Sequence, residues 1–195
     1  GVIPVVTSPY EELLEQLHPD VVVDAILAKK NLGTTRLDAP FVIGVGPGFS
    51  AGRDVNVVIE TMRGHNLGRC IYDGEAEPNT GIPGNVGGYT YERVIHSPKA
   101  GLFTAKRHIG DEVQANEVIG YVDEEPVRAK ITGTLRGILK TGLIVSDHFK
   151  LADVDARCEE SHCYSISDKS LAVGGGVLEA VTAWDYERNK DGKHL

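Results

Sequence analysis

Residues 100–123 read AGLFTAKRHIGDEVQANEVIGYVD, and they align without a gap with residues 132–155, TGTLRGILKTGLIVSDHFKLADVD. The alignment matches glycines and valines at equal spacing: Gly101 with Gly133, Gly110 with Gly142, Val113 with Val145, and Val122 with Val154. A short repeat that occurs twice does not form a solenoid, which requires at least three copies. We therefore predict a compact, mostly antiparallel β domain over residues 93–157, in which two related halves pack against each other.

The chain ahead of the repeat begins with an α/β pattern. The apolar run VIPVV at 2–6 precedes SPYEELLEQLH at 8–18, in which Ser8, Pro9 and Glu11 are start signals of a helix. The apolar run VVVDAIL at 21–27 is typical of a parallel strand that is buried on both faces. We predict a partial Rossmann-like strand–helix–strand unit over residues 1–39. Because such a unit cannot cover its own sheet, we expect the sequence to begin in the middle of an α/β domain.

The remaining two regions differ in composition. Residues 40–92 are predicted to form a glycine-rich mixed β region, in which DVNVVIETM at 54–62 favours a strand by its β-branched content. Its apolar spacing also fits a helix. In residues 158–195, a cysteine-containing loop precedes a predicted helix that starts at the glycines 174–176. The apolar face expected for that helix is Val177, Leu178, Val181 and Trp184.

Composition excludes several classes of function. A net charge of −8 and a pI near 5.3 argue against a sequence-independent grip on nucleic acid or on an anionic membrane. No apolar run approaches the roughly 20 residues of a membrane span. Three cysteines in a chain of 195 residues do not indicate a disulfide framework. We expect a soluble cytoplasmic protein with reduced thiols.

A glycine-rich turn in FVIGVGPGFSAGRD, residues 41–54, suggests an anion site, because backbone N–H groups approach a phosphate closely where side chains are absent. The turn matches neither the dinucleotide fingerprint nor the P-loop motif. Basic residues are nevertheless frequent in this half of the chain. The residues predicted to bind an anionic cofactor are Lys30, Gly46, Gly48, Arg53 and Arg63. In the alternative, the glycines serve only tight turns, Arg53 pairs with Asp54, and the lysines are solvated.

The predicted catalytic residues are Cys163, Asp168, Lys169 and His65. Lys169 could favour the thiolate of Cys163, and Asp168 could orient it, which would make Cys163 the functional thiol and leave Cys70 and Cys158 replaceable. A buried, inert cysteine is the alternative. His65 could act as acid, base or ligand, and a small-molecule enzyme that uses His65 with Asp168 is a further possibility. Cys158, His162 and Cys163 do not complete a four-ligand zinc site, so no metal site is predicted.

The first half of the repeat resembles the biotinyl and lipoyl carrier domains. The matching positions are Pro98, Gly101, Gly110, Asp111, Val113 and Ile119. This resemblance implies a barrel-sandwich domain. Where that family presents a modifiable lysine, this chain has the sequence DEEP at 123–126, so a swinging-arm cofactor is not expected.

Nearly the whole chain resembles a more specific family, the YqeB-type accessory proteins of the selenium-dependent molybdenum hydroxylase system. The phrases that carry this are VVVDAILAKKNLGTT, VIGVGPGFSAGRD, VIETMRGHNLGR, EPNTGIPG, PVRAKITGTLRG and ISDKSLAVGGGVLEA. The resemblance implies a maturation factor that handles a molybdopterin-type cofactor or a selenium species, with a molybdenum hydroxylase as partner. It leaves open whether the protein is an enzyme and whether it forms a homo-oligomer. The alternative is a non-catalytic scaffold or partner-binding module.

Overall fold

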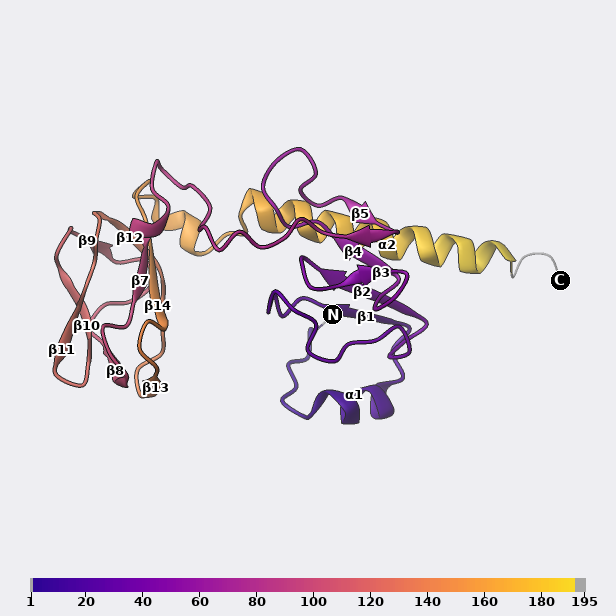
Figure 1. Cartoon of the computed structure of the whole chain (residues 1–195), viewed down its shortest axis with the longest axis horizontal. Coiled ribbons are helices and arrows are strands. Elements are labelled where there is room, and N and C mark those ends of the chain that lie inside the picture. Colours follow the sequence, from indigo (N-terminus) through magenta and orange to yellow (C-terminus); the bar gives the residue numbers. More distant parts are fainter. Residues whose placement is uncertain (1, 192–195) are drawn as a thin grey trace. The chain divides into compact units, whose positions relative to one another are not determined.

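The computed structural model describes residues 2–191, so residue 1 of the expected first region and residues 192–195 of the last lie outside the described residues. The protein is a mixed α/β structure with several sheets and a C-terminal helix (Figure 1). It divides into unit 1, residues 2–79 with 168–191, and unit 2, residues 80–167. Within the described part of the chain, no sheet closes into a barrel, and neither α-helix has the length and apolar character that a membrane crossing needs.

Unit 1 is built on a four-stranded sheet. Its elements are α1 (Tyr10–Leu17), β1 (Val21–Asp24), β2 (Phe41–Val45), β3 (Ser50–Ala51), β4 (Val57–Ile59), β5 (Cys70–Ile71), β6 (Gly74–Glu75) and α2 (Asp168–Asp191). The strand order is β1-β2-β4-β5, in which β1, β2 and β4 are parallel and β5 is antiparallel to β4. β3 and β6 form a separate two-stranded ribbon. The predicted strand within 54–62 is confirmed as β4.

Alternate residues of β2 and β4 explain why this sheet is buried on both faces. Phe41, Ile43 and Val45 pack with Val177 and Trp184 of α2. The residues between them point to the opposite face and pack against the ribbon of β3 and β6, in a cluster that contains Val42, Phe49, Ala51, Val55, Val58 and Ala76. Side chains that alternate between two apolar layers produce the near-continuous apolar strand that the sequence shows.

Helix α2 begins at Asp168, well before the glycines where the sequence predicts its start. Val177, Val181 and Trp184 pack on the sheet as predicted, and the Trp184 ring stacks on Phe41 with 5.2 Å between ring centroids. Leu178 was assigned wrongly to this apolar face, because its side chain is 67% exposed.

Three further expectations for unit 1 are corrected. Residues 2–6 form no strand, and Val2, Ile3 and Val5 are each at least 90% exposed. A strand requires a hydrogen-bonded neighbour, and within residues 2–191 none pairs with this run. The expected capping box is also wrong, because Pro9 occupies the N-cap of α1 and no side chain caps that end. The boundary expected near residue 39 does not separate two sheets, since β1 and β2 pair across it.

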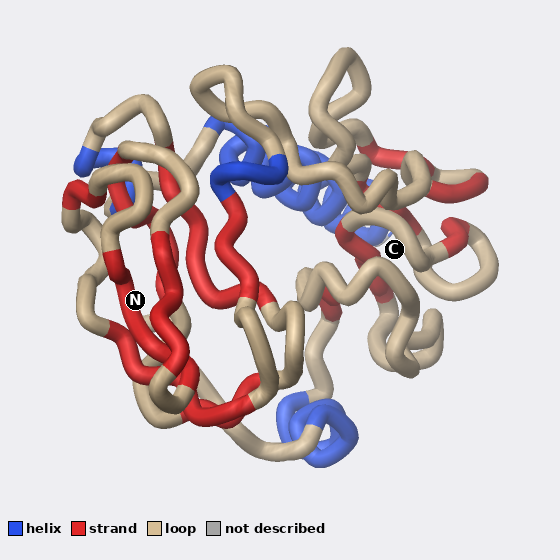
Figure 2. The backbone as a smooth tube through the Cα atoms, turned by 60° about the vertical axis from the view of Figure 1, so that its left-hand side comes forward, coloured by secondary structure: helices blue, strands red, loops and turns tan. Residues whose placement is uncertain are grey.

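Unit 2 is rich in strands (Figure 2), and its strand pairs are antiparallel. Its elements are η1 (Tyr91–Arg93), β7 (Val94–His96), β8 (Gly101–Ala105), β9 (Glu112–Val113), β10 (Val118–Val122), β11 (Glu125–Arg128), β12 (Gly133–Ile138), β13 (Leu143–Val145), β14 (Lys150–Asp155) and η2 (Glu160–Cys163). They form two sheets with the orders β11-β10-β8-β13 and β7-β14-β12-β9. The prediction of mostly antiparallel strands in this region is therefore confirmed.

The repeat is visible in the pairing of the strands. The offset that takes Gly101 to Gly133 takes β7, β8, β9 and β10 onto β11, β12, β13 and β14, and it converts the first sheet order into the second. Register follows the same rule, because Gly101 pairs with Val145 while Gly133 pairs with Val113. Each half therefore contributes strands to both sheets, so neither half can form its sheet without the other.

One core joins the two sheets of unit 2. It contains matched pairs from the two halves: Phe103 with Leu135, Val113 with Val145, Ile119 with Leu151, and Val122 with Val154. Apolar positions that the repeat matches therefore fill this core.

A buried carboxylate closes the end of β14. Asp155 is 1% exposed and accepts hydrogen bonds from Arg157 Nη2 at 2.6 Å and Nε at 2.9 Å. These bonds, with further help from the charges of Arg157 and Arg136, lower the pKa of Asp155 from 3.8 to about 2.

This carboxylate predicts a pH dependence for unit 2. Because the folded pKa lies below the unfolded one, ionised Asp155 stabilises the fold above about pH 4, and this contribution is lost as the pH falls towards 2. We expect Asp155→Asn to lower the free energy of unfolding by roughly 1–2 kcal/mol at pH 7 and by much less at pH 2. Denaturant unfolding at both pH values measures this difference. A cost that is equal at the two pH values would contradict the assignment.

Candidate functional site

The carboxyl ends of three parallel strands meet at one edge of the unit 1 sheet. β1 ends at Asp24, β2 at Val45 and β4 at Ile59, and their registers place these ends together. In open α/β sheets, ligands bind outside this edge. The segments that follow the three strands are 25–30, the glycine loop 46–49 and the segment 60–69.

The glycine loop is packed closely against its two neighbours. A Cβ on Gly46 would lie 2.9 Å from Thr61 Oγ1, and a Cβ on Gly48 would lie 2.5 Å from the Cα of Lys30. Both glycines also have positive φ angles, 86° and 109°, where other residues are strained. Gly46 and Gly48 therefore form a tightly packed turn. The same contacts bring the segments 25–30 and 60–69 beside the loop.

Three basic side chains gather at this edge, and we call Lys29, Arg63 and Lys169 the cation cluster. Lys169 lies in the first turn of α2 and is half-buried. Burial, followed by the charges of Lys29 and Arg63, lowers the pKa of Lys169 below its ordinary value. Like charges close enough to act on one another favour a bound anion, and so does the N-terminus of a long helix.

Two acidic side chains act on the cluster. Arg63 donates to both carboxylate oxygens of Asp168, with Nη2 at 3.0 Å from Oδ1. Two residues that were predicted for separate roles, Arg63 for the cofactor and Asp168 for catalysis, are thus an ion pair with each other. The second acid, Glu60, opposes the cations in their effect on the pKa of Lys169.

Glu60 is the site residue that the sequence analysis missed. It is 2% exposed, and its two carboxylate oxygens accept the backbone N–H groups of Met62 at 2.6 Å and Glu77 at 2.8 Å. These bonds hold the segment that carries Arg63. The available signal was a glutamate directly after the apolar strand VVI, at the edge where ligands bind.

The other predicted site residues of unit 1 lie on the surface. Arg53 is engaged by Asp54, with Nε 3.0 Å from Oδ1, and Nη2 lies 3.8 Å from Glu75. The alternative that paired Arg53 with Asp54 is therefore confirmed. Lys30 contributes its backbone to the packing of Gly48, and its side chain is exposed. His65 is exposed in the segment 60–69.

Cys163 lies in η2 of unit 2, whereas Asp168 and Lys169 belong to unit 1. Its half-buried thiol donates to the carbonyl oxygen of Leu135 at a distance of 3.8 Å. Cys70 is different, because its thiol donates to Gly176 O at 3.2 Å and burial, then the charge of Glu179, raises the pKa of that thiol. Over residues 2–191, no group of three or more His, Cys, Asp or Glu side chains is arranged to hold a metal ion.

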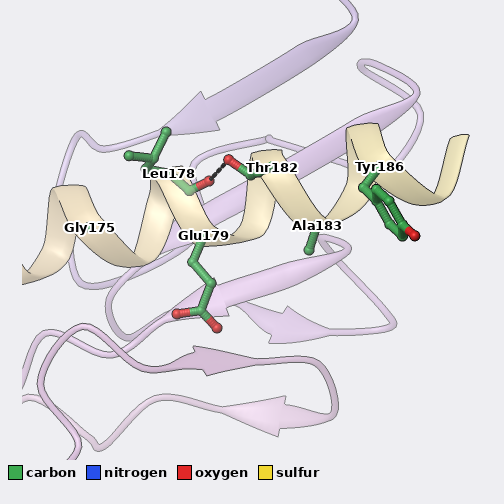
Figure 3. Close-up of a pocket in the computed structure, with 6 residues that line it drawn as sticks. All are labelled: Gly175, Leu178, Glu179, Thr182, Ala183 and Tyr186. Carbon is green, nitrogen blue, oxygen red and sulfur yellow. Dashed lines mark hydrogen bonds between the residues drawn. The ribbon is translucent and has the colours of Figure 1, made fainter. Parts of the chain in front are cut away.

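The outward face of α2 carries a shallow, open groove (Figure 3). Leu178 and Tyr186 line it and are both exposed, and the Thr182 hydroxyl donates to the Leu178 carbonyl oxygen at 2.7 Å. The groove holds one charged residue, Glu179, and has none of the cations of the edge site.

Two solved structures show weak likenesses to this chain. An aspartoacylase family protein from Mesorhizobium loti is 21% identical, with 33% of this chain and 23% of that chain covered and a TM-score of 0.31. The ectoine utilization protein EutE (DoeB) from Ruegeria pomeroyi is 17% identical, with 43% and 27% covered and a TM-score of 0.29. TM-scores this low do not establish a common fold.

Comparison of sequences is more informative. No protein-family model matches this chain. The chain is, however, 50% identical over 181 residues to the uncharacterized protein YqeB from Escherichia coli strain K12, and the match covers 93% of this chain and 34% of that protein. The chain thus spans about a third of the length of this curated relative, and the identity supports the YqeB-type family for it.

Proposed function

We propose that this chain is part of an accessory factor that handles the molybdenum cofactor or its selenium during maturation of a selenium-dependent molybdenum hydroxylase. The resemblance of its sequence phrases to such accessory proteins supports the assignment. The observation that carries the biochemical part is the cation cluster, which lies where three parallel strands end and where α2 begins. This is the arrangement that an anionic ligand requires.

The donor set fits the phosphate of a molybdopterin-type cofactor. Lys29 and Lys169 supply ammonium groups, and the N-terminus of α2 adds the positive end of the helix dipole. Arg63 is held beside them by Asp168 and adds a positive charge to the site. A bound cofactor would supply the metal and sulfur chemistry, while these residues would retain and orient it.

The proposal extends to two features of the fold, a Rossmann-like unit in unit 1 and a barrel-sandwich domain in unit 2. The parallel strands β1, β2 and β4 support a partial Rossmann-like unit. Two sheets built from exchanged halves support a barrel-sandwich domain, in which the β10–β11 turn carries Asp123 and Glu124 in place of a carrier lysine. Cys163 as a thiolate or as an acceptor of selenium or sulfur stays a prediction from the sequence.

A scaffold that binds only the hydroxylase is the second candidate. The observation that favours it is the close packing of Gly46 and Gly48, which accounts for the glycine loop without any ligand. The two candidates differ in one measurable property. A maturation factor retains cofactor, whereas a scaffold retains only its partner.

We expect Lys169→Met to lower cofactor retention at least tenfold, because loss of one of the ammonium groups removes a charge-assisted bond to the anion. The chain would be expressed beside the hydroxylase, and the purified protein would be analysed for molybdenum and pterin. Lys190→Met, in the last turn of the same helix, is the matched control and should retain cofactor fully. Equal retention in both variants would refute the edge site, and hydroxylase binding without cofactor in the unmodified protein would leave the scaffold.

A further inference from the structure

A second cavity, of about 470 Å³, lies in unit 1 between α1, β1 and the segment 25–40. This volume is within the range of small-molecule sites, about 300–1,000 Å³. Its walls include Tyr10 and Leu14 from α1, Val22 and Asp24 from β1, and Thr34 and Asp38 from the segment that follows. None of its lining residues belongs to the cation cluster.

Asp24 forms a buried polar wall of this cavity. It is 7% exposed, its Oδ2 accepts the hydroxyl of Thr34 at 2.7 Å, and its Oδ1 accepts the amide of Ile26 at 3.1 Å. An ionised carboxylate offers about four acceptor positions, so these two bonds leave room for a donor from a ligand.

A second carboxylate of the lining, Asp38, stays ionised. The Tyr10 hydroxyl donates to Asp38 Oδ2 at 2.6 Å. Burial, and then this bond, raises the pKa of Tyr10, so its hydroxyl remains a donor. Burial acts to raise the pKa of Asp38, but hydrogen bonds from Tyr10 and Thr35 lower it overall. The wall therefore carries negative charge at neutral pH.

The rest of the lining defines what the cavity can hold. Its charged members are Glu11, Asp24 and Asp38, and the described residues that line it include no lysine, arginine or histidine. Leu14 and Val22 are apolar walls, while Ile26 and Leu32 at the lining are 69% and 58% exposed. Exposed apolar side chains at a cavity are surface that an apolar ligand would cover.

We propose that this cavity binds a small organic ammonium compound with an apolar body. The ammonium group donates to Asp24 and lies near Asp38, and the apolar body covers Ile26 and Leu32. Anions of the same shape are excluded by the three carboxylates. The proposal concerns a site separate from the cation cluster, so it holds or fails independently of the maturation function.

Phenethylammonium is a suitable probe, with phenethyl alcohol and phenylacetate as neutral and anionic compounds of nearly the same shape. The protein would be labelled at its Ile, Leu and Val methyl groups and titrated with each compound by nuclear magnetic resonance. We expect saturable shifts at Ile26 and Leu32 with phenethylammonium, at least tenfold weaker binding of the alcohol, and no binding of phenylacetate.

Two variants locate the site. Asp24→Asn removes the carboxylate charge to which the ammonium group donates. Leu32→Lys places a cation at an exposed lining position that tolerates substitution. Each variant should weaken phenethylammonium binding at least tenfold. Leu178→Lys, an exposed leucine on α2, is the matched control and should bind as the unmodified protein does. The proposal would be overturned by saturable shifts that map to other residues, or by the lack of any saturable shift at millimolar probe. It would also be overturned if phenylacetate bound as strongly as the amine, or if Leu32→Lys left the binding of the amine unchanged.

Discussion

Leu135→Ala is expected to lower the free energy of unfolding of unit 2 by about 3 kcal/mol, because it leaves a cavity in a close-packed core. Leu135 is 0% exposed in β12, where it pairs with Val154 across the sheet. Its counterpart in the first half is Phe103, which is also 0% exposed and pairs with Val122. Since each half contributes strands to both sheets, loss of this contact weakens the whole unit rather than one hairpin.

Leu143→Ala is the matched control for this change. Leu143 lies in β13 of the same unit but is 45% exposed, so the same truncation should cost less than about 1 kcal/mol. Hydrogen exchange of the β8, β10, β12 and β14 amides reports unit 2 alone. Faster exchange in all four strands of Leu135→Ala is expected, and acceleration confined to β12 would show that the two halves fold separately.

Gly176→Ala is expected to destabilise unit 1 by about 2–3 kcal/mol through overpacking. A Cβ at this position would overlap the carbonyl oxygen of Gly68 and would lie 3.1 Å from Ile59 Cγ2. Gly68 is itself close to α2, because its own missing Cβ faces the backbone of Ala172. The helix therefore cannot accept a methyl group here without moving away from the sheet.

Gly175→Ala, at the adjacent residue, is expected to stabilise unit 1 instead of destabilising it. Nothing lies within 4 Å of a Cβ at Gly175, which borders the open groove on the outward face of α2 (Figure 3). Alanine should therefore stabilise the helix by up to about 1 kcal/mol through its higher helix propensity. Trp184 is the single tryptophan of the chain and packs on Phe41, so its fluorescence follows the docking of α2 during unfolding. Equal effects of the two substitutions would contradict the close contact of α2 with Gly68.

Local patterns of the sequence were sufficient for much of the fold. The ungapped repeat predicted an antiparallel domain because equal spacing of core residues in two segments produces equal strand registers. The apolar run at 21–27 predicted β1, because strands that are buried on both faces have few polar residues, and the β-branched content of 54–62 predicted β4. The strand predicted for the apolar run at 2–6 is wrong, because an apolar run becomes a strand only where a neighbouring strand pairs with it.

The candidate site could be predicted only in part. The sequence placed Arg63, Lys169 and the glycine loop among the candidates, because cations and glycines are the residues that anion sites use. It could not show that Arg63 pairs with Asp168, or that Cys163 and Lys169 fall in different units, because these relations depend on distances between segments far apart in the chain or on the division of the chain into units. Glu60 was missed since its two backbone partners come from turns whose course the sequence does not specify.

The sequence by itself determined the two helical regions and several of the strands, and that residues 101–155 contain two equivalent halves. Only the tertiary structure decided the roles of residues that look alike in the sequence. Gly174, Gly175 and Gly176 are identical letters, yet only Gly176 faces another backbone. Val177 and Leu178 are adjacent apolar residues, yet only Val177 packs on the sheet. The physical reason is that propensity and periodicity act along one chain, whereas packing and charge act across space between segments that the sequence does not order.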